Sequence, residues 1–585
     1  MDTTDMKASW GKILRFARKY WGWMIAAIAA AMAGTVLTLK GPDKLSEMVN
    51  TIADGFMTGI DMDAVKKIGF ILIAFYAASF VLSAFQQFVM ATVTQRVSQN
   101  MRSRISEKIS RLPMSYFNKV STGDVLSRVT NDVDAISQSL NQSIGTLVSA
   151  ITLFVGSLFM MITTNGIMTL AAVLSTIIGF GLMILIMSRS QKYFTQQQMR
   201  IGEINGHVEE IYSLHTTVKT YNGEEKSTKE FDRLNKDLKD SAFRAQSMSG
   251  LMMPLMQFIG NFGYVAVCVT GAVLAMNDKV SIGVIVAFMM YVRYFTQPLS
   301  QIAQAAQSLQ SASAAAERVF GFLEAQEQED ESDKSDVEMK EEAGTVHFKN
   351  VRFGYDPEKI IIQDFSAKAK PGQKVAIVGP TGAGKTTLIN LLMRFYELNG
   401  GSIEIGGIDT RNMTREQVHD QFCMVLQETW LFEGTIRENL TFGMDGISDE
   451  KIREAASAVG IAHYIETLPD QYDTVLSDSL NLSQGQKQQL TIARAMLEDK
   501  PMLILDEATS SVDTRTELKI QQAMDRLMEN RTSFVIAHRL STIKNADLIL
   551  VLKDGDVIES GTHDELLADK GFYHDLYMSQ FEKVA

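Results

Sequence analysis

Residues 374–396, KVAIVGPTGAGKTTLINLLMRFY, are the most informative segment in the second half of this chain. It reads as a buried apolar strand, a glycine-rich turn and a helix. The turn GPTGAGKT at 379–386 is a complete phosphate-binding loop. Its glycines let successive backbone N–H groups face phosphate oxygens, and the helix N-terminus adds its positive end. The loop predicts that Lys385 reaches the γ-phosphate and that Thr386 binds Mg²⁺. A plain glycine turn is the alternative, and the strand–loop–helix order disfavours it.

A second acidic site follows at MLILDE, residues 502–507. Four apolar residues predict a central strand, and Asp506 at its carboxyl end is expected to hold Mg²⁺ through water. Glu507 is placed to activate the attacking water as a general base. Many strands end in acidic residues, so this pattern alone is weak evidence. Placed roughly 120 residues after a complete phosphate loop, it becomes strong evidence.

From Thr345 onward, short β-rich runs alternate with helical stretches. Such alternation predicts a largely parallel sheet covered by helices. The runs are VHFKNVRF, KVAIVG, SIEIGG, MLILDEA, TSFVIAH and LILVLKDG. With the phosphate loop, they indicate an α/β nucleotide-binding domain over residues 345–585.

The first half differs, because long apolar runs recur in it. Each is near the ~20 residues that a helix needs to cross about 30 Å of hydrocarbon. They lie at 21–39, about 68–95, 143–163, 167–188, about 249–276 and 281–305. These runs predict a polytopic α-helical membrane domain of six transmembrane helices over residues 1–320. A cleaved signal peptide is the alternative for the first run, but its 20-residue leader with two Asp fits an anchored helix better.

Basic residues between the spans orient the helices. Segment 96–128 holds seven Lys and Arg and segment 189–244 holds ten, whereas the loop at 163–166 has none. By the positive-inside rule, the two basic segments and both termini are cytoplasmic. The first outer loop fits less well, with Lys40, Lys44, Lys66 and Lys67. Folded as helical hairpins, the two basic segments would reach about 30 Å beyond the membrane, too far for plain connections.

Charge separates the two halves. Residues 1–320 carry 29 Lys and Arg against 22 Asp and Glu, and residues 321–585 carry 27 against 46. Residues 321–344 hold ten acidic residues and two Lys, and we interpret them as a solvated acidic linker, a spacer rather than a docking tail. Only two cysteines occur, which excludes a disulfide scaffold and a four-Cys metal site. A disordered chain is excluded by 30 Phe and 15 Tyr, which can bury a large core.

LSQGQ at 482–486, followed by KQQLTIARAML, resembles the signature of ATP-binding cassette (ABC) transporters. The fused order of membrane domain and then nucleotide-binding domain resembles a bacterial ABC exporter half-transporter over essentially the whole chain. The likeness is greatest to one subunit of the heterodimeric multidrug exporters. The resemblance implies ATP and Mg²⁺ as cofactors, and ATP hydrolysis coupled to transport.

The resemblance also implies roles in nucleotide binding. Tyr355 matches the aromatic residue that stacks on adenine. Gln427 matches the loop glutamine that reaches Mg²⁺, so that the implied metal-binding residues are Thr386, Gln427 and Asp506. The loop residues that bind ATP are Gly379, Pro380, Thr381, Gly382, Ala383, Gly384, Lys385, Thr386 and Thr387.

Further roles concern catalysis and the partner chain. His538 matches the switch histidine that holds the γ-phosphate and orients the catalytic base Glu507; taken alone, a satisfied histidine at a strand end would be the simpler reading. Asp513 matches the loop that crosses the dimer interface. The signature residues, which face ATP bound by the opposite chain, are Leu482, Ser483, Gln484, Gly485 and Gln486.

Two segments of the first half resemble the intracellular loops whose short coupling helices rest on the nucleotide-binding domains. They are YFNKVSTGDVLSRVTNDV at 116–133 and VEEIYSLHTTVKTYNGEEK at 208–226. Both lie in the long basic excursions. Surface helices of mixed charge are the alternative. They explain the composition equally well, but not how far these segments extend beyond the membrane.

The sequence departs from the family pattern around the signature. Gln484 stands where glycine is usual, and TVLSDSLN at 474–481 lacks the glutamate and paired glycines common in symmetric exporters. These departures favour a heterodimer over a homodimer, with this chain as its catalytically competent half. One phosphate loop binds only one face of ATP, so a second half-transporter is expected as the partner.

The function that the resemblance implies is multidrug-type efflux of hydrophobic or amphipathic small molecules across the bacterial cytoplasmic membrane by alternating access. Membrane lipids and a hydrophobic substrate are the other expected partners, with no nucleic acid. The alternatives are a homodimeric lipid or peptide exporter and an ATP-gated channel. An importer is disfavoured because no docking site for a binding protein is recognisable, and a soluble ATPase is contradicted by the six spans.

Overall fold

The computed structural model describes residues 3–56, 59–334, 337–356, 358–426, 429–477, 482–506, 514–537 and 543–581. The chain divides into two compact units. The first unit comprises Met1–Ser110 and Thr122–Ala325, and the second comprises Arg111–Ser121 and Gln326–Ala585. Residues 111–121 therefore belong with the C-terminal half although they lie between two membrane helices in sequence.

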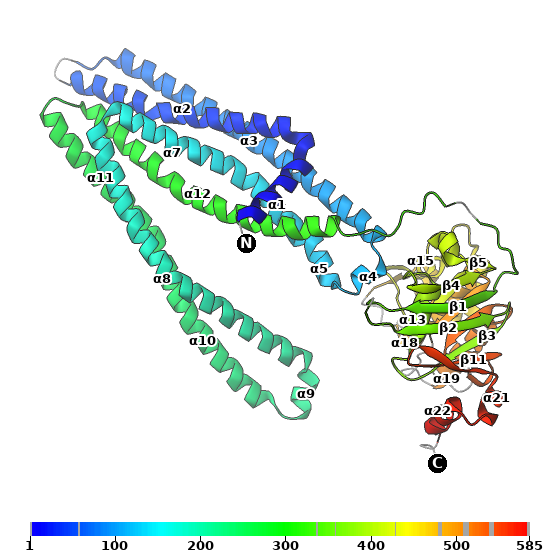
Figure 1. Ribbon diagram of the computed structural model, residues 1–585. Coiled ribbons are helices and arrows are strands. Elements are labelled where there is room, and N and C mark those ends of the chain that lie inside the picture. Colours follow the sequence, from blue (N-terminus) through cyan, green and yellow to red (C-terminus); the bar gives the residue numbers. More distant parts are fainter. Residues whose placement is uncertain are drawn as a thin grey trace. The chain divides into compact units, whose positions relative to one another are not determined.

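In the described residues of the first unit, all regular secondary structure is helical (Figure 1). Its principal helices are α1 (Thr3–Phe16), α2 (Trp21–Asp54), α3 (Met62–Arg111), α7 (Ile144–Thr164), α8 (Gly166–Ser213), α10 (Glu224–Gly250), α11 (Met252–Met276) and α12 (Ile282–Leu323). Six helical stretches in the described residues are long and apolar enough to cross a membrane, which confirms the prediction of six spans. Helix α12 packs against α2 and α7, and α8 packs against α10 and α11.

Apolar side chains lie on both the inside and the outside of this unit. Phe288 and Tyr291 of α12 are completely buried in a cluster with residues of α7, α8 and α11. In contrast, Phe70, Phe80 and Phe88 along α3 are each more than 70% exposed. Large apolar surfaces of this extent are unfavourable in water and favourable in lipid.

Helix α2 extends further than the sequence predicts. Lys40 and Lys44, expected in the first outer loop, lie inside the helix, which continues through the buried Pro42. Proline interiors are tolerated in membrane helices when neighbouring groups stabilise the backbone. The continuation is held by α12: the Tyr291 hydroxyl donates to Asp43 Oδ1 at 2.5 Å, and the Gly283 N–H donates to Asn50 Oδ1 at 2.9 Å.

The segment before α7 contains two π-helical stretches. It runs through α5 (Thr122–Ser127), the π-helical η2 (Arg128–Asp132), α6 (Val133–Gln138) and the π-helical η3 (Ser139–Ser143). The buried carboxylate of Asp132 accepts a hydrogen bond from Arg318 Nε of α12 at 2.9 Å. This ion pair holds the π-helical stretch η2 against α12.

The second unit contains a six-stranded sheet in the order β12-β11-β3-β10-β9-β6. Its strands are β3 (Lys374–Val378), β6 (Phe422–Val425), β9 (Met502–Asp506), β10 (Thr532–Ile536), β11 (Leu548–Lys553) and β12 (Asp556–Gly561). Five run parallel, and β12 pairs antiparallel at the edge. The prediction of a membrane domain followed by an α/β nucleotide-binding domain is confirmed.

A separate antiparallel sheet was not predicted. It comprises β2 (Ile362–Ala369), β1 (Val346–Phe353), β4 (Gly400–Ile405) and β5 (Ile408–Asp409), in that order. The runs VHFKNVRF and SIEIGG, expected in the parallel sheet, are β1 and β4 of this one. Only residues 354–361 connect β1 to β2. A parallel crossover needs a dozen or more residues, so this short connection requires antiparallel pairing.

The six-stranded sheet carries helices on both faces. Met502 and Ile504 of β9 pack in one core cluster with α13 (Lys385–Leu392). Leu503 and Leu505 pack in a second cluster with α18 (Gln484–Glu498) and α19 (Thr514–Leu527). Because successive strand residues point to opposite faces, α13 and α18 lie on opposite sides of the sheet.

Shorter elements complete both units. They are η1 (Ala17–Tyr20), α4 (Met114–Phe117), α9 (His215–Thr220), η4 (Thr410–Asn412), α14 (Arg415–His419), β7 (Gly434–Thr435), α15 (Ile436–Thr441), α16 (Asp449–Ala458), α17 (Ala462–Thr467), η5 (Gln471–Asp473), β8 (Val475–Leu476), α21 (His563–Ala568) and α22 (Phe572–Phe581).

The acidic segment 321–344 differs from the solvated spacer that its composition predicts. Its first residues continue α12 as far as Leu323. Further on, the Glu331 side chain is only 13% exposed and pairs with Arg394 and Arg415 of the second unit. Two guanidinium groups compensate the cost of burying this carboxylate. The segment is therefore attached to Arg394 and Arg415 at this point.

Candidate active site

The phosphate loop joins the central strand β3 to α13. Gly382 and Gly384 have φ angles of 86° and 97°, a left-handed conformation that glycine adopts without strain. A Cβ atom on Gly379 would lie 2.3 Å from the carbonyl oxygen of Leu552, so the loop passes that strand too closely for any side chain. The glycines thus shape a tight turn whose N–H groups lead into the unpaired first turn of a helix. This is a cradle for an anion.

Lys385 lies over this loop. Its ammonium donates to the carbonyl oxygens of Gly379 at 2.8 Å and Pro380 at 3.0 Å. Burial lowers the pKa of the Lys385 ammonium, and the carboxylate of Asp506 partly offsets that effect. The Lys385 side chain thus lies over the phosphate loop and close enough to Asp506 to interact with its carboxylate, where a nucleotide's phosphates fit the donor set.

Asp506 and the loop lie at the same edge of the sheet. In the parallel register, Ile536 of β10 is opposite both Ile377 of β3 and Asp506 of β9. Asp506 is therefore level with the end of β3, two strand spacings or roughly 10 Å away. The structure brings together two of the predicted sites, which are 120 residues apart in sequence, as a metal–phosphate site requires.

Tyr355 lies above the first turns of α13. It is 43% exposed, and its hydroxyl donates to Thr387 Oγ1 at 3.3 Å. Its ring meets the ring of Tyr396 edge to face, with centroids 5.0 Å apart. The side chain is thus partly exposed beside the phosphate loop, where a stacking partner can reach it. Sequence reasoning missed Tyr396, because no short-range pattern marks an aromatic residue beyond the end of a helix.

The signature residues cap α18. Ser483 Oγ accepts from the Gln486 N–H at 3.2 Å, while Gln486 Oε1 accepts from the Ser483 N–H at 2.8 Å, a reciprocal capping box. The side chain of Gln484 donates to Thr429 Oγ1 at 3.2 Å. Within the described residues, no hydrogen bond joins the signature to the phosphate loop, and α13 and α18 cover opposite faces of the sheet. One chain does not bring these two sites together.

Several predicted residues lie outside the described part of the chain, namely Gln427, Glu507, Asp513 and His538. The described strands β6, β9 and β10 end at Val425, Asp506 and Ile536, shortly before three of them in sequence. Their roles stay predictions.

The two expected coupling segments each contain a short helix. α4 overlaps the start of 116–133 and belongs to the second unit, where the Asn118 side chain donates to the Tyr396 hydroxyl. α9 lies at the tip of the hairpin of α8 and α10, flanked by Tyr212 and Tyr221, which are 84% and 80% exposed.

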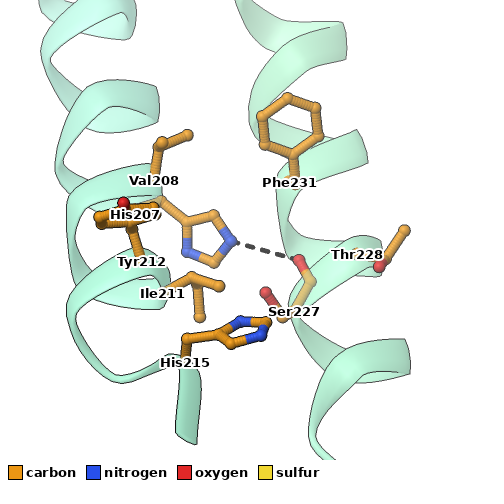
Figure 2. Close-up of a pocket in the computed structure, with 8 residues that line it drawn as sticks. All are labelled: His207, Val208, Ile211, Tyr212, His215, Ser227, Thr228 and Phe231. Atoms are coloured by element: carbon orange, nitrogen blue, oxygen red, sulfur yellow. Dashed lines mark hydrogen bonds between the residues drawn. The ribbon is translucent and has the colours of Figure 1, made fainter. Parts of the chain in front are cut away.

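Figure 2 shows a pocket of about 310 Å³ beside α9. Its lining comes from α8, α9 and α10, and His207 Nε2 donates across it to the Ser227 carbonyl oxygen at 3.2 Å. This hydrogen bond joins α8 to α10 just before the tip of the hairpin. It therefore stabilises the two helices that carry α9.

Known proteins share this organisation. Residues 24–299 match the family model described as the ABC transporter transmembrane region, and residues 362–510 match the one described as ABC transporter. A fatty acid ABC transporter ATP-binding/permease protein of Mycobacterium tuberculosis is 44% identical over 550 residues, covering 94% of this chain and 87% of that protein. An ATP-dependent lipid A-core flippase of Syntrophus aciditrophicus is 31% identical over 579 residues, covering 98% and 94%.

A solved structure is also similar over nearly the full length. It is a bacterial Atm1-family ABC exporter with ATP bound, with a TM-score of 0.74, 25% identity, and coverage of 97% of this chain and 99% of that chain. The chain belongs to the ABC transporter family. It is an exporter half-transporter, a multi-pass membrane protein whose cassette binds and hydrolyses ATP, and this fold normally works as a dimer with another half-transporter.

Proposed function

We propose that this chain is one half of a dimeric exporter that moves amphipathic small molecules out across the cytoplasmic membrane of a bacterium. The observation that carries the proposal is that the phosphate loop of Lys385 and the carboxylate of Asp506 lie at one sheet edge, in a chain whose described residues include six helices long and apolar enough to cross a membrane. The basic segments 96–128 and 189–244 support cytoplasmic termini and a cytoplasmic cassette.

Each site residue has a proposed task. Tyr355 stacks on the adenine, and the loop from Gly379 to Thr387 cradles the phosphates. Thr386, Asp506 and Gln427 hold Mg²⁺, which when bound neutralises charge that develops on the phosphates. Glu507 takes a proton from the attacking water, and His538 orients that base.

The geometry of the sheet supports a two-chain site. Because α13 and α18 cover opposite faces, the signature of Ser483 and Gly485 is directed away from the chain's own phosphate loop. A second chain is then needed to close each nucleotide, with Asp513 crossing the interface. Closure on ATP favours one membrane conformation and hydrolysis releases it, since a ligand shifts an equilibrium by its differential affinity.

The substrate class is amphipathic, and the relatives' names favour acyl chains within it. The multidrug specificity implied by the sequence stays a prediction. Reconstituted in liposomes, the transporter is expected to move a fluorescent long-chain fatty acid in an ATP-dependent manner. A cationic fluorescent dye tests the multidrug alternative in parallel. Movement of neither probe by an ATP-hydrolysing preparation would contradict both specificities.

The heterodimer is a separate proposal and rests on Gln484 and the run 474–481. A side chain at position 484 occupies space where glycine allows close approach to phosphate. Expressed alone, the chain is expected to show weak ATPase activity that a second half-transporter restores. A stable homodimer of the single chain with vigorous hydrolysis, seen by mass in detergent, would favour the homodimeric exporter instead.

A further inference from the structure

Tyr396 lies between the nucleotide site and the first coupling segment. Its ring contacts Tyr355 edge to face at 5.0 Å between centroids, and Phe353 at 5.6 Å. Its hydroxyl accepts a hydrogen bond from the side chain of Asn118, which directly follows α4. One side chain thus touches both the proposed adenine-stacking residue and the coupling segment.

The backbone fixes Tyr396 from two directions. It follows α13, whose first residue is Lys385, and the Phe395 N–H donates to the Asn390 carbonyl at 2.9 Å beyond the end of that helix. Asn399 joins the same loop to the end of β1, because its side chain accepts from the Gly354 N–H at 2.7 Å. Displacements at the phosphate end or at the base end of a nucleotide therefore both reach Tyr396.

The coupling segment meets the cassette beside a cleft of about 430 Å³. The residues that line this cleft include Tyr116 and Lys119 of the coupling segment and Phe395, Tyr396 and Arg415 of the cassette. The hydrogen bond from Asn118 to Tyr396 joins the same two parts of the chain. Packed rings and hydrogen bonds of this kind carry energetic coupling between sites.

We propose that Tyr396 is a positioning residue that transmits the nucleotide-dependent position of Tyr355 to the first coupling segment through Asn118. The inference rests on the proposed role of Tyr355 in adenine binding. The ring of Tyr355 contacts the ring of Tyr396, and the Tyr396 hydroxyl accepts a hydrogen bond from Asn118. Without that hydroxyl, the coupling segment no longer responds to nucleotide binding, although the nucleotide still binds.

Amide hydrogen exchange of the full-length protein, with and without Mg·ATP, tests this step. In the wild type, ATP is expected to change exchange in residues 112–121. Tyr396→Phe keeps the ring but loses the acceptor, and Asn118→Ala loses the donor. Each is expected to abolish most of that change while the KM for ATP stays within about threefold, near the 0.65 kcal/mol that such a factor represents. Tyr464→Phe, which removes a hydroxyl from α17, is the matched control and should behave as wild type.

The outcomes are distinct. Equal loss in both single variants and in the double variant supports a shared route. A wild-type ATP response that persists in Tyr396→Phe overturns the inference, as does a wild type that binds ATP without any response in residues 112–121. Failure of the wild type to bind ATP would instead contradict the proposed function. A raised KM without loss of the response would show that Tyr396 only supports Tyr355.

Discussion

The guanidinium Nη1 of Arg394 lies 2.9 Å from the carboxylate Oε1 of Glu331. Arg394 is 4% exposed and has a φ of 53°, a left-handed conformation that is strained for a residue with a side chain. The ion pair lies just beyond α13, the helix that begins at the phosphate loop. It therefore ties the acidic linker to the same loop that carries Tyr396.

Replacing Glu331 by Gln is expected to destabilise the second unit by about 2 kcal/mol. This is below the usual cost of breaking a buried ion pair, because Glu397 still lies 3.1 Å from Arg394. The unfolding midpoint in detergent should fall by about 4–8 °C. Glu329→Gln removes the same charge from an exposed position and is the control. Equal midpoints for the two variants would contradict the role of the pair.

The contribution of Glu331 also depends on pH. Burial raises the pKa of the Glu331 carboxyl, but the Arg415 N–H, Lys334 and the two guanidinium groups together hold its pKa below the usual value. For a lowered pKa, the stabilisation is complete above the unfolded pKa of about 4.3 and is lost as pH falls through the folded value. The difference in midpoint between wild type and Glu331→Gln should stay constant from about pH 8 to 5 and shrink below about pH 4.3. A difference that grows in acid would contradict this.

Glu507→Gln is expected to leave ATP binding nearly intact and to lower ATPase activity roughly 10²–10⁴-fold. The amide cannot accept the water's proton, while Lys385 and Asp506 still hold the nucleotide. Steady-state hydrolysis and nucleotide binding are measured on the same preparation, with a partner that lacks a competent site. Glu450→Gln, on the exposed face of α16, is the control. More than about a tenth of wild-type activity would exclude Glu507 as the base.

Gly379→Ala is expected to weaken Mg·ATP binding at least about tenfold, or 1.4 kcal/mol. The new Cβ would meet the Leu552 carbonyl oxygen at 2.3 Å, so the loop must move and lose its shape. Calorimetric titration measures the affinity. Gly321→Ala, where a Cβ meets nothing within 4 Å, should bind ATP as the wild type does. Unchanged affinity in Gly379→Ala would contradict the cradle geometry.

Deleting Ser121–Asp124 should leave ATP binding intact and stop transport. The deletion removes the junction at which the chain passes from the second unit back to the first, and it shortens the reach of α4. Transport in liposomes and nucleotide binding are compared. Replacing the same four residues by alanine keeps the length and should retain transport. Normal transport by the deletion variant would refute a transmission role for 116–133.

The parts of the candidate site that could be predicted from the sequence are those formed by contiguous residues. The phosphate loop and the strand before Asp506 are local patterns whose chemistry follows from their order. Six spans were predictable because apolar runs of this length have few other uses. The assignment of β1 and β4 to a second sheet was not, because alternation marks a strand but not its partners.

Contacts between residues far apart in the chain could not be predicted from the sequence either. Asn118 and Tyr396 are 278 positions apart, and nothing local to either indicates the other. Glu331 lies among ten acidic residues of which composition singles out none. The first apolar run ends at residue 39, yet the contacts of Asp43 and Asn50 with α12 keep α2 continuous as far as Asp54.

The two π-helical stretches, η2 and η3, each hold one residue more than an α-helical turn would. A one-residue deletion inside either stretch can convert its π turn to an α turn and leave the face that α7 presents unchanged. A one-residue deletion in the regular helix α6 or α7 has no such turn to absorb it, and it rotates everything that follows by about 100° around the helix axis. The two π turns are therefore the places in this segment where the chain should tolerate a change of length.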